Sequence, residues 1–209
     1  MARRSPAPAP LSPSAEIRGR IVTAARRIFL AHGFRGVTMG DLAAELGMSK
    51  KTLYAHFPSK ADLTEAVLLD KLQSLEADVA EVAGTSPADF LHVLQRLLAC
   101  LQKHADEIQP AFLRDLQRES PDLFRVVEQR RKDIIQRHFG QVLGAGRREG
   151  LIRRDVPVAL IIEILLGAVQ SVMNPPKLAE HGLTPSTGLT AILTVILEGV
   201  LTKPRKAKP

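Results

Sequence analysis

Cysteine is nearly absent from this chain of 209 residues, since Cys100 is the only one and lies among leucines. One cysteine cannot form an intramolecular disulfide, so a disulfide-stabilised fold is excluded and a reducing compartment, the cytoplasm, is expected. We interpret Cys100 as a core residue, because free cysteines are among the most frequently buried residues. The fold must therefore depend on its apolar core, which a chain of this length can build.

Long apolar runs are also missing. The longest, VPVALIIEILLGAVQSVM at 156–173, is interrupted by Glu163 and Gln170 and predicts a buried helix in place of a membrane span. The first residues, MARRSPAPAPLSPS, contain arginines but no apolar stretch, so no secretory signal is expected. The sequence thus favours a soluble protein.

Patterns of catalysis are equally scarce. We find no glycine-rich phosphate loop and no arrangement of Ser, His and Asp that would make a nucleophile, so neither a catalytic residue nor a cofactor is predicted. His92, His104 and His138 are interpreted as scattered, without an i, i+4 pair or a nearby cysteine, so no metal site is predicted. These absences disfavour an enzyme.

Positive charge is present and is concentrated at one end. Residues 1–60 contain ten Lys or Arg and three Asp or Glu, whereas the remaining residues contain 19 of each sign. The whole formal net charge of +7 therefore belongs to the first sixty residues. Clustered cations suit a nucleic acid, because neutralised phosphates release counterions. A solvated basic face that only improves solubility is the simpler alternative.

Apolar residues recur at helical spacing almost throughout, and no segment has a strand pattern. We expect an all-α fold of nine helices. They span about residues 14–31, 38–46, 50–57, 60–82, 87–101, 107–118, 121–143, 158–173 and 186–202. Ser86 and Pro87 would begin the fifth helix, Pro110 would bend the sixth or lie late in its first turn, and NPP at 174–176 would end the eighth.

The segment TMGDLAAELGMSKKTLYAHF, residues 38–57, has the pattern of a helix-turn-helix. Ala43 is small where two helices would nearly touch, and Gly47 can adopt the left-handed turn between them. Thr38 and Ser49 are suited to cap the two helices. An exposed second helix of this kind can enter the major groove of DNA.

The first seventy residues resemble the DNA-binding domain of the tetracycline-repressor (TetR/AcrR-type) transcription factors, and the pattern that carries the resemblance is IVTAARRIFLAHGFRGVTMGDLAAELGMSKKTLYAHFPSKADL, residues 21–63. The resemblance covers about a third of the chain. It implies an N-terminal helix-turn-helix domain followed by a larger helical domain that binds a small molecule and dimerises. We expect a disordered arm at 1–13, the DNA-binding domain at 14–60, the second domain at 61–202 and a disordered basic tail at 203–209.

The resemblance also implies roles for individual residues. Thr38 and Ser49 match helix caps, with Thr38 also a phosphate contact. Lys50, Lys51 and Thr52 match the base-reading first turn of the recognition helix. Tyr54, His56 and Lys60 match phosphate contacts. Lysine donors suit the O6 and N7 acceptors of guanine, so a guanine in each half-site is expected. Gly40 stands where many relatives have a larger side chain, which makes the recognition helix more responsible for sequence choice.

The rest of the chain suggests where an effector and a second copy would bind. The predicted effector pocket comprises Phe90, Leu94, Phe112, Phe124 and His138, with Phe139 as a further aromatic nearby. The predicted dimer interface comprises Ile161, Leu165, Ala168, Val172, Leu189, Ile192 and Ile196, on two helices with apolar residues on more than one face. An ordinary core explains these apolar residues equally well. Arg130, Arg131 and Lys132 are interpreted as a solvated face.

Together these observations predict a cytoplasmic, homodimeric transcriptional repressor that binds a palindromic operator in double-stranded DNA and is released from it by a small, largely apolar effector. Activation remains open, because the sign depends on where the operator lies relative to a promoter. The alternative from a different class is a helical carrier of lipids or small molecules with a basic surface. That alternative lacks support in the first helix, where aromatic residues do not accompany the basic ones.

Overall fold

The computed structural model describes residues 12–84 and 90–200, and every regular element within these ranges is a helix. The helices are α1 (Pro13–His32), α2 (Met39–Glu45), α3 (Lys50–His56), α4 (Lys60–Ala83), α5 (Phe90–Asp106), α6 (Pro110–Glu119), α7 (Pro121–Arg148), α8 (Val158–Val172), α9 (Pro175–Glu180) and α10 (Pro185–Val200). The prediction of an all-α fold is confirmed. No helix in the described ranges has both the length and the apolar character that crossing a bilayer requires.

The helix starts follow the capping residues of the sequence. Thr38 Oγ1 accepts the Asp41 N–H at 3.1 Å, while the Asp41 carboxylate accepts the Thr38 N–H at 2.8 Å. Ser59 and Asp62 form the same reciprocal pair at the start of α4, with N–H to oxygen distances of 3.1 and 2.9 Å. Each pair satisfies two backbone donors at a helix end, so local sequence alone is enough to set where α2 and α4 begin.

The predicted number of helices and the predicted role of Pro110 are wrong. NPP does more than end α8, because Asn174 accepts the Lys177 N–H at 3.1 Å and caps the six-residue helix α9. The described ranges therefore contain ten helices and not nine. Pro110 opens α6 at its first position, where its missing N–H costs nothing, so it does not bend a helix that is already under way.

Some predictions fall on residues that the structure does not describe. These are the basic tail at 203–209, the helix start at Ser86 and Pro87, and most of the arm at 1–13. Ser12 and Pro13 are described, and they form the cap and first turn of α1.

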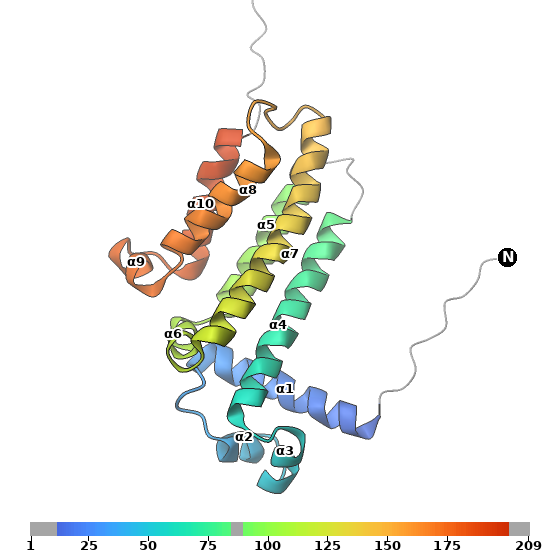
Figure 1. The fold of residues 1–209 in the computed structure, drawn as a ribbon, viewed down its shortest axis with the longest axis vertical. Coiled ribbons are helices and arrows are strands. Elements are labelled where there is room, and N and C mark those ends of the chain that lie inside the picture. Colours follow the sequence, from blue (N-terminus) through green and yellow to red (C-terminus); the bar gives the residue numbers. More distant parts are fainter. Residues whose placement is uncertain (1–11, 85–89, 201–209) are drawn as a thin grey trace, which may run out of the picture.

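The helices form an elongated molecule (Figure 1). Helices α1, α2 and α3 lie at one end, and α8 packs against α10 in the other half. Helices α4, α5 and α7 run along the long axis and pack against one another, whereas α6 lies near the middle and contacts α1 and α7. Helices α1, α2 and α3 are thus held away from the α8 and α10 pair by the long helices.

Helix α4 belongs to two apolar cores. Its first half contributes Leu63, Val67 and Leu68 to a core formed with α1, α2, α3 and α6. Its second half contributes residues from Leu72 to Val82 to a core formed with α5, α7, α8 and α10. The predicted domain boundary between residues 60 and 61 coincides with the first turn of α4, so one continuous helix joins the two predicted domains.

Gly33 ends α1 in a conformation that favours glycine. Its φ is +79°, and its N–H donates to the Phe29 carbonyl at 2.8 Å. A Cβ at this position would overlap the Asp115 carboxylate, which accepts the Arg35 N–H at 2.9 Å. The end of α1 therefore packs closely on α6.

Replacing Gly33 by alanine is expected to lower the free energy of unfolding by about 1–3 kcal/mol, because the new methyl group meets both the positive φ and the Asp115 carboxylate. Urea unfolding followed by circular dichroism measures the change. Gly36→Ala in the same loop is the matched control, since a Cβ there has open space, and should change stability by less than about 0.5 kcal/mol. Equal effects of the two substitutions would contradict the packing described for Gly33.

Candidate nucleic-acid interface and cavity

Helices α2 and α3 form a helix-turn-helix whose turn is built as the sequence predicts. Gly47 has a φ of +62°, and the Met48 N–H donates to the Ala43 carbonyl at 2.9 Å. Ala43 is 2% exposed, while Leu42 and Leu53 are fully buried between the helices and the core. The angle between α2 and α3 is therefore fixed by packing and by the turn.

The first turn of α3 is capped and exposed. Ser49 Oγ accepts the Thr52 N–H at 3.0 Å and lies 2.9 Å from the Thr52 hydroxyl. Lys50 and Lys51 are exposed, and Tyr54 is 46% exposed. Lys50, Lys51 and Tyr54 thus share the outer side of α3, whereas Thr52, the third predicted base-reading residue, is half-buried.

Gly40 gives Lys50 its position. A Cβ at Gly40 would lie 2.8 Å from Cε and 3.1 Å from Nζ of Lys50, so the lysine stem lies across the glycine. Hydrogen bonds from the Thr38 side chain and backbone lower the pKa of Asp41, and the Lys50 charge lowers it further. The small residue in α2 therefore brings a cation of α3 over the start of α2.

The other residues predicted to contact phosphate differ in how many of their polar groups are already hydrogen-bonded within the chain. Lys60 Nζ donates to the Val37 carbonyl at 2.8 Å and to the Arg35 carbonyl at 3.2 Å, which leaves one N–H of the ammonium for another partner. Thr38 Oγ1 donates to the Asp41 carboxylate at 2.7 Å, and His56 is half-buried at the end of α3. Lys60 thus ties the loop before α2 to the start of α4.

The sequence interpretation missed Arg18. Its guanidinium lies 4.2 Å from the centroid of the Phe57 ring and donates to the His56 carbonyl at 3.2 Å. These contacts bring an exposed cation of α1 to the last turn of α3. No local pattern identifies it, because the two partners lie 38 and 39 residues further along the chain.

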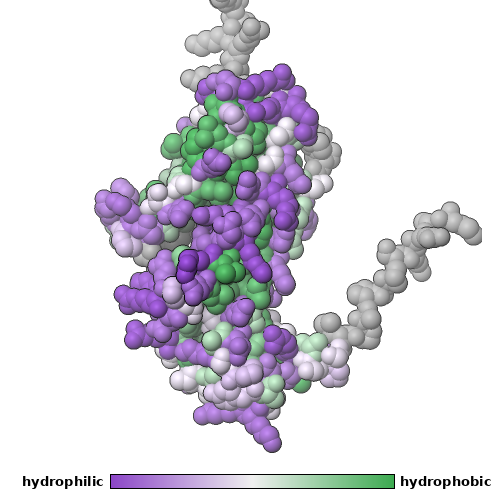
Figure 2. All heavy atoms as spheres, viewed as in Figure 1, coloured by the Kyte–Doolittle hydropathy of each residue, from purple (hydrophilic) through white to green (hydrophobic). Residues whose placement is uncertain are grey.

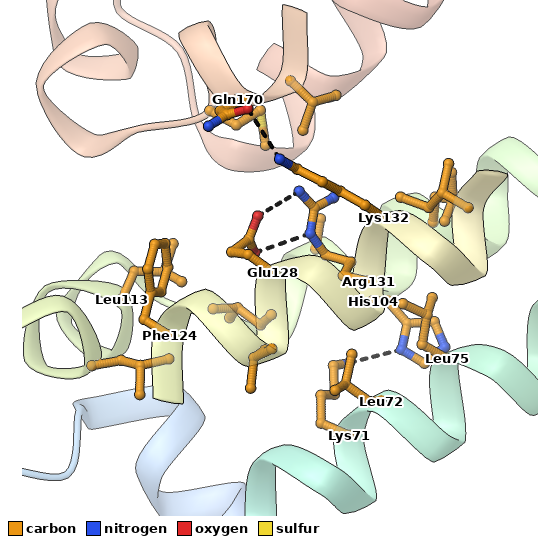
Figure 3. A pocket seen from close by; sticks show the side chains of 18 of the residues that line it. Lys71, Leu72, Leu75, His104, Leu113, Phe124, Glu128, Arg131, Lys132 and Gln170 are labelled. Carbon is orange, nitrogen blue, oxygen red and sulfur yellow. Dashed lines mark hydrogen bonds and ion pairs between the residues drawn. The ribbon is translucent and has the colours of Figure 1, made fainter. Parts of the chain in front are cut away.

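A cavity of about 670 Å³ lies between α4, α5, α6, α7, α8 and α10. Most of its wall is apolar (Figure 3). The apolar wall includes Leu68, Leu72, Phe112, Phe124, Leu165 and Leu189. Cavities of this size and character accommodate small organic molecules.

Two of the five predicted pocket residues line this cavity, namely Phe112 and Phe124. Phe90, Leu94 and His138 do not line it, and the prediction is wrong for them. Phe90 is buried against Gly146, where even a Cβ would overlap its ring, and Leu94 lies in the same core. His138 is 7% exposed, and neither of its ring nitrogens has a hydrogen-bond partner among the described residues.

Charged residues line one side of the cavity, and Arg131 and Lys132 are among them. Arg131 donates to both carboxylate oxygens of Glu128 at 3.0 and 2.7 Å, and Lys132 Nζ donates to Gln170 Oε1 at 3.2 Å (Figure 3). Both are half-buried. The interpretation as a solvated face is therefore wrong for Arg131 and Lys132, because the periodicity of α7 does not reveal that α8 packs beside it, whereas Arg130 is exposed.

Below the cavity, one carboxylate connects three helices. Glu107 Oε2 accepts from Lys71 of α4 at 2.7 Å and from Arg26 of α1 at 2.9 Å. Arg26 also donates to Asp70 at 3.0 Å and to Ser74 at 2.8 Å. Lys71 lines the cavity, so this network links the cavity wall to the first helix.

The pKa values in this network follow from burial and pairing. Burial acts to raise the pKa of Glu107, but the hydrogen bonds from Lys71 and Arg26 outweigh it and lower the pKa to about 2. Burial lowers the pKa of Lys71 despite its bond to Glu107. Burial and the Lys71 charge likewise lower the pKa of His104. His104 is therefore neutral at neutral pH.

His104 joins the network through both ring nitrogens. Its Nδ1 lies 2.8 Å from Lys71 Nζ and its Nε2 lies 3.0 Å from Asp78 Oδ2. A neutral ring can accept at Nδ1 and donate at Nε2, and the bond from His104 lowers the pKa of Asp78. The buried ammonium and the carboxylate are thus bridged by the imidazole.

Cys100 lies four residues before His104, so the interpretation that no cysteine is near a histidine is wrong. One ligand atom each of Asp78, Cys100 and His104 lie within 4.8 Å of one another. However, His104 already bonds Asp78, burial raises the pKa of the Cys100 thiol, and structural zinc sites use four ligands. We interpret the cluster as a hydrogen-bonded pair beside a thiol.

The residues of the predicted dimer interface lie mainly on the inner sides of α8 and α10. Ile161, Leu165, Leu189 and Ile192 are each at most 8% exposed within the chain's own core, so they are not surface residues and the prediction is wrong for them. Ala168, Val172 and Ile196 are partly buried against the same core.

The outer sides of α8 and α10 also carry apolar residues. Leu160 and Ile164 of α8 are 44% and 51% exposed, and Val195 of α10 is 73% exposed. Gly167 and Gly199 on these helices have open space around them. Figure 2 shows an apolar area in the upper part of the molecule, where Figure 1 places α8 and α10. These outer sides can accept a second apolar surface.

Comparisons with known proteins agree with this architecture. Residues 21–67 match the sequence model of a family described as bacterial regulatory proteins, tetR family. The HTH-type transcriptional regulator YvaF of Bacillus subtilis is 27% identical over 187 residues, which cover 87% of this chain and 94% of YvaF. The HTH-type transcriptional repressor DhaR of a Mycobacterium species is 26% identical, covering 88% of this chain and 92% of DhaR.

A third relative and a solved structure extend the comparison. The HTH-type transcriptional activator FasR of Mycolicibacterium smegmatis is 33% identical over 97 residues, which cover 46% of this chain and 42% of FasR. The structure of the ketosteroid transcriptional regulator KstR2 of Mycobacterium tuberculosis is similar with a TM-score of 0.56 and 26% identity, covering 90% of this chain and 96% of that one.

Replacing Glu107 by glutamine is expected to lower the free energy of unfolding by about 1–3 kcal/mol at neutral pH, because Lys71 and Arg26 lose their shared carboxylate. The lower part of this range is expected, because the Glu107 side chain is 35% exposed and water screens the pair. The loss is measured by urea unfolding.

The pH dependence has a defined sign. A carboxyl whose pKa falls from 4.5 to about 2 on folding stabilises the fold fully above 4.5 and loses this effect as the pH falls towards 2. The difference between wild type and Glu107→Gln should therefore shrink across that interval. Glu65→Gln on the exposed side of α4 is the control, and a pH-independent difference for Glu107→Gln would contradict the assignment.

Proposed function

We infer that this chain is a DNA-binding transcriptional regulator of the tetR family of bacterial regulatory proteins, and we propose that it acts as a homodimeric repressor released by a small-molecule effector. The observation that carries the proposal is the first turn of α3, where two exposed lysines follow a serine cap on a helix held rigidly by α2. Binding to DNA, and not catalysis, is its proposed role.

The proposed DNA contacts follow from exposure and charge. Lys50, Lys51 and Thr52 would meet base edges in the major groove, and Tyr54 and His56 would contact phosphates on either side. Thr38, Ser49 and Lys60 would add contacts at helix starts, where backbone N–H groups attract phosphate. The concentration of net positive charge in residues 1–60 supports this surface over any other on the chain.

We favour repression over activation because the match to a repressor extends over more of this chain than the match to an activator. The similarity to the activator FasR spans less than half of this chain, whereas the similarity to the repressor DhaR spans 88% of it. The longer match includes the helices that form the cavity and so bears on regulation as well as on DNA binding.

Release by an effector is supported by how the cavity meets the DNA-binding end. Its wall includes Lys71 and Phe112, and these residues belong to helices that pack on α1. The Gln109 N–H at the start of α6 also donates to the Leu30 carbonyl of α1 at 2.9 Å. An occupant that moves α6 or α4 would therefore move α1 and change the spacing of two recognition helices in a dimer.

Dimerisation through the outer sides of α8 and α10 completes the proposal. Exposed Leu160, Ile164 and Val195 would pack across a two-fold axis, and the small residues Gly167 and Gly199 would allow close approach. A two-fold dimer presents two recognition helices to the half-sites of a palindromic operator. We propose that residues 14–60 read DNA and residues 61–202 bind the effector and dimerise, in the cytoplasm where the DNA is.

The double variant Lys50→Ala, Lys51→Ala is expected to bind a DNA duplex that wild type selects from a random pool at least about tenfold more weakly, because base and phosphate contacts are lost. Fluorescence anisotropy of a labelled duplex, repeated at several salt concentrations, measures the affinity and its salt slope. The matched control is Lys103→Ala, Lys177→Ala, which removes two exposed lysines far from α3 in sequence. Wild-type affinity in the first variant would overturn the assignment of α3.

Ile164→Asp and Val195→Asp are each expected to weaken dimerisation at least about tenfold, because a carboxylate would be buried at the interface. Sedimentation velocity over a range of concentrations measures the dimer dissociation constant. Val126→Asp is the control, since Val126 of α7 is 50% exposed but lies outside the proposed surface. A dimer that tolerates both substitutions would place the interface elsewhere.

A further inference from the structure

The charged side of the cavity is not electrically balanced. Four cationic residues line the cavity, Arg125, Arg131 and Lys132 of α7 and Lys71 of α4, against one acidic residue, Glu128 of α7. The opposite wall, from α4, α6 and α10, is mainly apolar. The cavity is therefore amphipathic, with its positive side on α7.

Three of these cations have a carboxylate partner. Lys71 pairs with Glu107, Arg131 pairs with Glu128 and Arg125 pairs with the neighbouring Asp122. Lys132 differs, because among the described residues its recorded partner is the neutral oxygen of Gln170 at 3.2 Å. One positive charge of the cavity wall is thus not neutralised within the described part of the chain.

The surroundings of Lys132 suit a carboxylate. Lys132 is half-buried between α7 and α8, but its hydrogen bond to Gln170 is exposed, so an anion can reach the ammonium (Figure 3). Gln170 accepts from Lys132 through Oε1, so its amide N–H groups are directed away from that bond and can donate to the same anion. Arg131 keeps donors beyond the two it gives to Glu128.

We propose that the cavity binds an amphipathic monoanion, with an apolar body against Leu72, Phe112 and Phe124 and a carboxylate at Lys132 and Gln170. This proposal rests on the proposed function, since it identifies the chemical class of the effector for the same cavity. It adds one negative charge to the expected largely apolar effector. A single unneutralised cation favours one negative charge over the several charges of a polyphosphate.

The test compares ligands that share a chain and differ in charge. Isothermal titration calorimetry with full-length protein should show that decanoate binds about tenfold or more tightly than 1-decanol, as expected for one charge-assisted pair. Decylammonium should bind more weakly than either. Equal affinity for decanoate and 1-decanol, or no binding of decanoate, would overturn the proposal.

Variants locate the carboxylate. Lys132→Met should remove most of the preference for decanoate while leaving the affinity for 1-decanol within about twofold, because the apolar wall is intact. Lys177→Met on exposed α9 is the matched control and should keep the preference. A preference that survives in Lys132→Met would place the anion elsewhere and overturn the assignment.

Measuring whether the selected duplex stays bound when ligand is added distinguishes a failure of this inference from a failure of the proposed function. If decanoate binds with the expected dependence on Lys132 but the selected duplex stays bound, effector release is wrong and the ligand class stands. If 1-decanol releases the duplex as well as decanoate does, effector release stands and the inference is overturned.

Discussion

The buried face of α4 is the constraint on which both halves of the molecule depend. A single helix of 24 residues carries apolar side chains that complete the core under the DNA-binding helices at one end and the core around α5 and α7 at the other. Such a helix is about 36 Å long and bends little, so the two cores cannot shift independently along it. Lys71 lies between the cores, Leu72 begins the second one, and both line the cavity, which places any occupant against the segment where the two halves meet.

The parts of the fold that depend on local chemistry could be predicted from the sequence. Capping by Thr38, Ser49 and Ser59 uses residues within one turn, and the positive φ of Gly47 is needed for a turn of that length. The helix α9 was missed because Asn174 caps a helix of only six residues, too short to show periodicity. Pro110 was misplaced for a related reason, since a proline that opens a helix and one that bends it have the same sequence neighbours.

The cavity and the exposed apolar surface depend on which helix faces pack against each other. The spacing of apolar residues along one helix does not show which face packs inward. Helices α8 and α10 are apolar on two sides, so the pattern alone could not show that Ile161 and Ile192 turn inward while Ile164 and Val195 turn outward. The Glu107 network was invisible because its partners Lys71 and Arg26 are 36 and 81 residues away. Its effect on ionisation is correspondingly non-local: one carboxylate near the end of α5 holds two cations that belong to α1 and α4.

Tyr54 gives the proposed interface an optical property of its own. It is the only tyrosine in a chain without tryptophan, and it is 46% exposed on the outer side of α3. Apart from the weak contribution of phenylalanine, the near-ultraviolet absorption and the fluorescence of the protein therefore arise from Tyr54 on the recognition helix alone. The native protein thus carries an intrinsic spectroscopic reporter at the surface that is proposed to meet DNA, and events in the distant cavity reach that signal only through the intervening helices.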